Sequence, residues 1–215
     1  TEDELYEDAF ARLNELVEMG TGAIEIKSGY GLTMEAELKI LRVIKRLKAT
    51  SDVTIKATFL GAHALPKEFK NNKDAYMDLV INEMLPKVAE GNLADYVDIF
   101  CEKGYFTVDD TKRLLVAANK YKIPSKTHVN QFNAIGGVKT SVNLGSLSVD
   151  HLEKMATEDY DALKNSECMP TILPACSFFL EIPYGPAKKM IEEGLPVALA
   201  TDYNPGSSPS GNMNF

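Results

Sequence analysis

The feature that most constrains the fold is a regular alternation of short apolar segments with longer segments of helical periodicity. Several of the apolar segments are apolar throughout, which is typical of strands that are covered on both faces. Strict alternation of strands and helices predicts a parallel sheet with right-handed crossovers. Seven segments have the length of a buried strand: 23–30, 53–64, 96–101, 125–130, 148–152, 169–174 and 196–202.

The segments between these strands carry signals of helix ends. Thr1 and Glu4 have the spacing of a capping box, and Thr107 with Asp110 begins another helix in the same way. Shorter helices are expected at 132–144, 156–164 and 184–193. The longer helices each have one apolar stripe, formed by Leu5, Ala9, Leu13, Leu16 and Val17, by Ile40, Leu41, Ile44 and Leu47, by Met77, Ile81, Met84, Leu85 and Val88, and by Leu114, Leu115 and Ala118.

The alternation favours an α/β fold of the (β/α) TIM-barrel type. No G-x-G-x-x-G motif follows the first strand, so an open nucleotide-binding sheet is less favoured. A closed barrel has eight strands and about 250 residues, whereas this chain has 215 residues, seven predicted strands and a helix before the first of them. We therefore expect an incomplete barrel, containing strands 2 to 8 in one catalytic domain (1–215), with the first strand upstream of Thr1 and a C-terminal part beyond Phe215.

Composition and charge exclude several classes of function. The net charge of 23 − 31 = −8, without a basic stripe, argues against nucleic acid as a partner, and no apolar run approaches the roughly 20 residues that span a membrane. Cys101, Cys168 and Cys176 form no C-x-x-C pair, so we expect core thiols in a reducing cytoplasm. A barrel that lacks one strand has two open sheet edges, which predicts a homo-oligomer.

Polar residues occur where barrel enzymes keep their chemistry, at the carboxyl ends of strands. His63, His128 and His151 end three of the predicted strands, and Asp202 ends the last. A lone histidine of this kind is more often a hydrogen-bonded core residue. Three histidines and an aspartate at strand ends instead indicate a catalytic divalent metal that keeps one position open for water.

Other polar segments near the strand ends allow two interpretations each. Two glycines in 27–32 permit a tight turn that presents Tyr30, or the segment is a plain βα loop. Gln131 contacts a ligand or caps a helix, and Glu102 supports the site or starts a helix. The polar loop 202–209 binds an anion through its backbone or is an ordinary turn.

This pattern resembles the amidohydrolase superfamily, whose fifth, sixth and eighth barrel strands end in His, His and Asp. If the first strand precedes Thr1, His128, His151 and Asp202 fall on those strands. The closer resemblance is to the imidazolonepropionases, hydrolases of histidine degradation that open the ring of 4-imidazolone-5-propanoate to give N-formimidoyl-L-glutamate. The residues that carry it are 27–32, 58–64, 98–102, 128–137, 149–153 and 200–207.

The resemblance implies a role for each matching residue. His128 and Asp202 resemble ligands of one zinc or iron ion. Asp202 is also the expected catalytic base, and His151 is expected to face the scissile carbonyl. The residues expected to contact the small-molecule substrate are Tyr30, His63, Gln131, Asn204, Gly206 and Ser207.

The chain departs from the family pattern in three respects. The His-x-His pair of the first strand and the substrate-binding arginine after it are absent from these 215 residues, and Gln131 stands where many relatives have glutamate. We therefore expect this segment alone to bind metal weakly and to be inactive. Two alternatives remain: a Schiff-base lyase that uses Lys126, which shares an inward face with His128, and a non-catalytic ligand-binding remnant.

Overall fold

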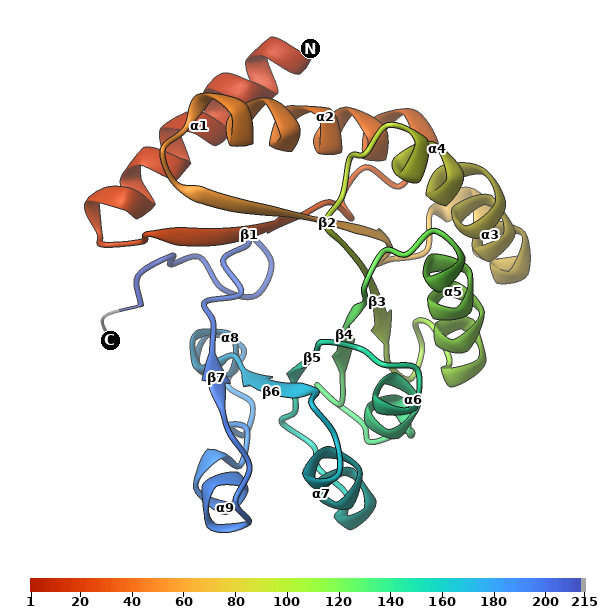
Figure 1. Cartoon of the computed structure of the whole chain (residues 1–215), viewed down its shortest axis with the longest axis vertical. Coiled ribbons are helices and arrows are strands. Elements are labelled where there is room, and N and C mark those ends of the chain that lie inside the picture. The colour runs from red at the N-terminus through yellow and green to blue at the C-terminus, as the bar shows by residue number, and fades with distance from the viewer. Residues whose placement is uncertain (214–215) are drawn as a thin grey trace. The chain divides into compact units, whose positions relative to one another are not determined.

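The computed structural model describes residues 1–213 and contains a seven-stranded sheet. The strand order is β1 to β7 along the sheet, and every neighbouring pair is parallel (Figure 1). The predicted number of strands and the predicted parallel arrangement are therefore confirmed. The strands are Ala23–Lys27 (β1), Thr54–Ala62 (β2), Tyr96–Cys101 (β3), Lys126–Val129 (β4), Ser148–His151 (β5), Met169–Ile172 (β6) and Ala198–Leu199 (β7).

The described chain forms two compact units. The N-terminal unit contains residues 1–99 and 113–124, and the C-terminal unit contains 100–112 and the chain from 125 onward. Strand β3 contributes Tyr96 to Ile99 to the first unit and its last two residues to the second.

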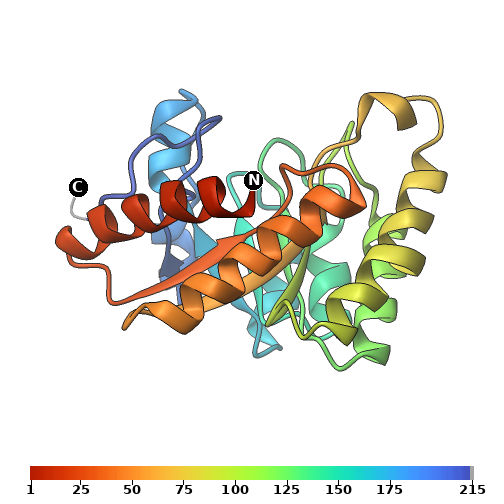
Figure 2. The same cartoon turned by 90° about the horizontal axis from the view of Figure 1, so that it is seen from above.

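The N-terminal unit packs helices against β1 and β2. Helix α1 (Glu2–Glu18) begins with the predicted capping box, in which the Thr1 hydroxyl accepts a hydrogen bond from the backbone of Glu4 at 3.2 Å. Helices α1 and α2 (Met34–Thr50) lie side by side, and α2 covers β2 (Figures 1 and 2). The remaining elements are η1 (Lys67–Phe69), α3 (Lys73–Leu79), a π-helical turn η2 (Val80–Met84) and α4 (Leu85–Glu90).

The C-terminal unit has helices α6 (Gly137–Asn143), α7 (Thr157–Lys164), α8 (Pro174–Phe179) and α9 (Ala187–Glu192). Helix α5 (Val108–Lys120) begins in this unit and ends in the other. As predicted, Thr107 and Asp110 cap it, since the Asp110 carboxylate accepts from the Thr107 backbone at 2.8 Å. The buried core of this unit is formed by Cys101, Val129, Val138, Val149, Leu152, Tyr160, Leu163, Cys168, Ile172, Met190 and Leu195.

Several predicted boundaries were wrong. Strand β7 is only Ala198–Leu199, so Asp202 lies in the following loop, where its positive φ of 54° ends any extended backbone. Strand β6 ends at Ile172, and the unpredicted helix α8 starts at Pro174, a residue suited to the first turn of a helix. Strand β3 has the predicted bounds 96–101, and the other predicted strands and the short helices are shorter than predicted at one or both ends.

Most residues of the predicted apolar stripes are buried, whereas Leu5, Ala9, Ile40 and Ile81 are half-buried. Val17 of α1 is 40% exposed, and Tyr6 is buried in that helix instead. None of the helices in the described part of the chain has both the length and the apolar character needed to cross a bilayer.

Candidate active site

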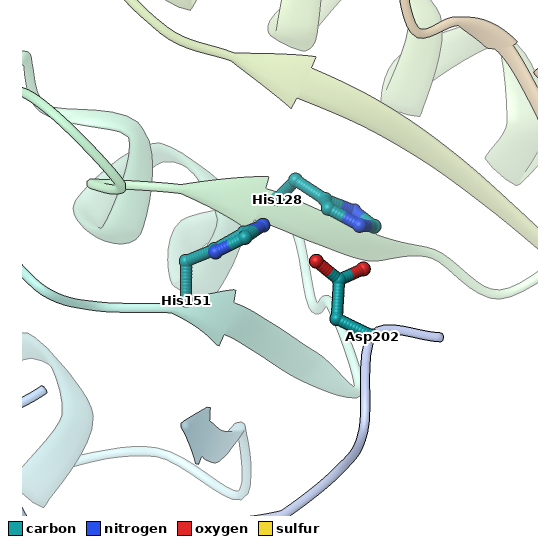
Figure 3. A group of neighbouring side chains, drawn as sticks. All are labelled: His128, His151 and Asp202. Carbon is teal, nitrogen blue, oxygen red and sulfur yellow. The ribbon is translucent and has the colours of Figure 1, made fainter. Parts of the chain in front are cut away.

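Three of the predicted site residues converge in the C-terminal unit. His128 lies in β4, His151 is the last residue of β5, and Asp202 follows β7. One nitrogen of each imidazole and one carboxylate oxygen of Asp202 all lie within 4.8 Å of one another. Figure 3 shows the three side chains pointing toward a common centre. Both histidines are buried and Asp202 is half-buried.

The backbone at this cluster is unusual. His151 has φ 87° and Asp202 has φ 54°, values that residues other than glycine rarely adopt. Such conformations persist where the surrounding structure imposes them, and they concentrate at functional sites. The Phe100 ring lies 6.4 Å from each of the rings of His128 and His151, so one aromatic side chain borders both imidazoles.

The loop after β7 forms a hydrogen-bond network around Asp202. The Ser207 hydroxyl donates to Oδ2 of Asp202 at 3.1 Å, and the Asn204 amide donates to the Asp202 carbonyl at 2.6 Å. Oδ1 of Asn204 accepts from the backbone N–H groups of Gly206 and Ser207, both at 2.8 Å. The Ser207 hydroxyl thus contacts the Asp202 carboxylate directly, and Asn204 holds the backbone of Asp202 and of the rest of the loop.

Gln131 and Cys176 lie beside this cluster. The Gln131 amide donates to Sγ of Cys176 at 3.5 Å, and both side chains are buried. Burial, together with the nearby Asp202 carboxylate, raises the pKa of the Cys176 thiol to about 12. The prediction that all three cysteines are buried and free is confirmed. Sequence reasoning did not anticipate that Cys176 borders Asp202.

Glu102 holds the turn that carries Gln131. Its carboxylate accepts hydrogen bonds from the backbone N–H groups of Phe132 (2.9 Å), Asn133 (3.2 Å) and Lys103 (2.8 Å). It also accepts from the Asn133 amide at 3.0 Å. Glu102 was expected either to support the site or to start a helix. Its contacts with the turn after Gln131 match the first interpretation.

Tyr30 and His63 form a separate pair in the N-terminal unit. His63 directly follows β2, and its ring centroid lies 5.0 Å from that of Tyr30. Nδ1 of His63 lies 3.3 Å from the carbonyl oxygen of Gly29. Because a carbonyl can only accept, Nδ1 is the donor in this contact. Tyr30 is 58% exposed, so its side chain is available to a ligand.

No family model matches the chain. Curated imidazolonepropionases match all 215 residues: the enzyme of Christiangramia forsetii is 63% identical, that of Flavobacterium johnsoniae 58%, and that of Thermoanaerobacter pseudethanolicus 44%. In each case the match covers 100% of this chain and 52% of the relative.

Solved structures of known enzymes share the fold. A triazine hydrolase variant aligns with a TM-score of 0.76 at 14% identity, covering 99% of this chain and 51% of that chain. Guanine deaminase from C. acetobutylicum aligns with a TM-score of 0.70 at 13% identity, over 98% of this chain and 53% of that chain. Over its whole length the chain is thus related in sequence to the imidazolonepropionases, as its motifs predicted, and it spans about half the length of those curated relatives.

Proposed function

We propose that the protein containing this chain hydrolyses the ring amide of 4-imidazolone-5-propanoate to N-formimidoyl-L-glutamate. The sequence relationship to imidazolonepropionases over all 215 residues supports this substrate. The observation that carries the proposal is the convergence of His128, His151 and Asp202 within 4.8 Å. His128 and Asp202 offer the imidazole nitrogen and carboxylate oxygen that a hydrolytic metal ion takes as ligands, and His151 lies at the same point.

The donor set of this cluster fits one divalent metal ion, zinc or iron. Imidazole nitrogen and carboxylate oxygen are ligands of both metals. We assign His128 and Asp202 as ligands and leave His151 to face the substrate carbonyl. When bound, the metal supplies Lewis-acid character and lowers the pKa of the attacking water to about 7.

Asp202 and His151 carry the proton and charge movements of the proposed reaction. Asp202 accepts the proton of the attacking water, whose oxygen forms a bond to the ring carbonyl carbon. His151 donates a hydrogen bond to the carbonyl oxygen as negative charge develops there. Asp202 then delivers the proton to the ring nitrogen as the carbon–nitrogen bond breaks. The hydrogen bond from Ser207 holds the Asp202 carboxylate in one orientation for both transfers.

Six residues are proposed as substrate contacts. The exposed phenol of Tyr30 and the adjacent imidazole of His63 support a role in binding the polar substrate. The amide of Gln131 can donate a hydrogen bond but cannot act as a base. The remaining three contacts come from the loop after β7, namely Asn204, Gly206 and Ser207. Asn204 and Ser207 hydrogen-bond to Asp202, and Gly206 hydrogen-bonds to Asn204.

The wider assignment follows the same relationship. We propose that the seven strands correspond to strands 2 to 8 of a TIM-type barrel, that 1–215 is one catalytic domain, and that the protein is a cytoplasmic homo-oligomer. Residues 214–215 lie outside the described residues. We also propose that the segment alone is inactive, because two protein ligands rarely hold a catalytic zinc.

The test is the rate of 4-imidazolone-5-propanoate hydrolysis by the full-length protein. Asp202→Ala is expected to lower kcat/KM by about a thousandfold or more, since it removes a ligand and the base. The matched control is Asp161→Ala, an exposed aspartate of α7, which should retain activity. Near-normal turnover by Asp202→Ala would overturn the proposal. Borohydride trapping at Lys126 with a carbonyl substrate, insensitive to chelators, would instead support a Schiff-base lyase.

A further inference from the structure

Glu37 is a fully buried carboxylate in the first turn of α2, and its partners lie in the loop between β1 and α2. Its Oε2 accepts from the backbone N–H of Gly29 at 2.9 Å. Its Oε1 accepts from the N–H groups of Gly31 at 2.6 Å and Leu32 at 3.1 Å. Three backbone donors that converge on one carboxylate form an anion-binding nest, and here the anion is part of the same chain.

The loop is shaped closely around this carboxylate. A Cβ at position 31 would lie 2.6 Å from the backbone nitrogen of Glu37, so only glycine fits there. Leu32 has a positive φ of 58°, which a leucine rarely adopts. The hydrogen bonds to Glu37 therefore hold a backbone conformation that the loop sequence alone does not favour.

The same loop controls both of the proposed substrate contacts in the N-terminal unit. Gly29 donates its N–H to Glu37, and its carbonyl oxygen receives Nδ1 of His63. Tyr30, between the two glycines that Glu37 holds, packs its ring against that of His63. The Glu37 carboxylate is thus linked to Tyr30 through the backbone and to His63 through a single residue, Gly29.

We propose that Glu37 is a positioning residue, an internal anion that fills the amide nest of this loop and thereby orients Tyr30 and His63 for substrate. The inference rests on the proposed function insofar as Tyr30 and His63 contact the substrate. It also predicts that removal of the Glu37 side chain leaves three backbone donors around a void of about the size of acetate, into which a free carboxylate fits.

The experiment compares Glu37→Ala with Glu35→Ala in the full-length protein. Glu35 is exposed in the same first turn, so its replacement removes the same charge without touching the loop. We expect Glu37→Ala to raise KM for 4-imidazolone-5-propanoate about 10- to 100-fold, with a smaller change in kcat, because misplaced binding groups weaken substrate binding. Millimolar acetate should lower the KM of Glu37→Ala toward the wild-type value in a saturable manner. Glu35→Ala should have the wild-type KM both with and without acetate.

Amide hydrogen exchange provides a second readout that does not depend on activity. The N–H groups of Gly29, Gly31 and Leu32 should exchange faster in Glu37→Ala and regain protection with acetate. Glu37→Gln, which retains the volume and one acceptor oxygen, should give an intermediate loss if the alanine variant does not fold. If Glu37→Ala and Glu37→Gln both kept the wild-type KM and the wild-type exchange rates, the inference would be overturned. If the wild-type protein does not hydrolyse the imidazolone, the proposed function fails. Amide exchange in Glu37→Ala, measured with and without acetate, still tests whether Glu37 holds the loop.

Discussion

Oε1 of Glu153 lies 3.5 Å from Nδ1 of His151, and both side chains are almost completely buried. The same carboxylate oxygen accepts a hydrogen bond from the Ser177 hydroxyl at 3.0 Å. A carboxylate beside one ring nitrogen fixes the orientation and protonation pattern of an imidazole and leaves the other nitrogen for chemistry. We therefore expect Glu153 to orient the His151 ring toward the cluster with His128 and Asp202.

Replacing Glu153 by Gln should lower kcat by about 10- to 100-fold with little change in KM, the usual effect of losing a partner behind a functional histidine. The measurement is steady-state hydrolysis of 4-imidazolone-5-propanoate by the full-length protein. Glu158→Gln, at an exposed position of α7, is the control and should behave as the wild type. If the Glu153 variant retained its kcat, Glu153 would have no part in orienting His151.

Replacing Glu102 by Gln should raise KM, because it weakens the three hydrogen bonds that hold the turn after Gln131. Hydrogen bonds to a charged group contribute roughly 1.5–3 kcal/mol each, so the variant should also be less stable by about that amount. Urea unfolding and substrate titration measure the two effects. Glu167→Gln, exposed in the same unit, serves as the reference. Unaltered KM and stability would show that the turn holds without Glu102.

Replacing Gly137 by Ala should destabilise the protein by about 1–3 kcal/mol through overpacking. A Cβ at this position would lie 2.9 Å from Cγ1 of Val129 and 3.1 Å from Sγ of Cys101. Gly22→Ala is the matched control, since no atom lies within 4 Å of the Cβ that it would add. Thermal unfolding should separate the two variants. Equal melting temperatures would contradict the close approach of α6 to β3 and β4.

The stability of the protein should decrease as pH rises from about 9 to 12. Burial, with a further contribution from Asp150, raises the pKa of Cys168 from 9.0 to about 12 in the folded state. The unfolded thiol therefore loses its proton first, and the unfolded state is favoured by at most about 1.4 kcal/mol per pH unit for one thiol. Urea midpoints at pH 8 and pH 10 should differ less in Cys168→Ala than in the wild type. Identical pH dependence would refute this contribution.

The alternating pattern of the sequence was sufficient to predict the parallel sheet, and the position of polar residues at strand ends was sufficient to predict the cluster of His128 and His151. From the sequence alone, Glu37 can be interpreted only as an acidic residue in the first turn of a helix. That interpretation is compatible with its position, but its contact with the loop depends on backbone angles such as φ 58° at Leu32. Sequence periodicity contains no information about such angles, so the hydrogen bonds between Glu37 and the loop could not be predicted.

Strand β7 and helix α8 illustrate a second limit of the pattern. The apolar run 196–202 predicts a full strand, but only Ala198 and Leu199 pair with β6. Likewise, the segment from Met169 to Pro174 was predicted to be one strand, because a short apolar run is typical both of a buried strand and of the start of a buried helix. Only the hydrogen-bond pattern of the folded chain separates β6 from α8 at Leu173.

The most direct test of the account is the metal content of two histidine variants of the full-length protein. His128 is assigned as a ligand, whereas His63 is assigned to the substrate, so only His128→Ala should lose the ion. Elemental analysis after dialysis should give about one zinc or iron per chain for the wild type and for His63→Ala, and a severalfold lower content for His128→Ala. Full metal content in His128→Ala, or its loss in His63→Ala, would contradict the assignment of the metal centre.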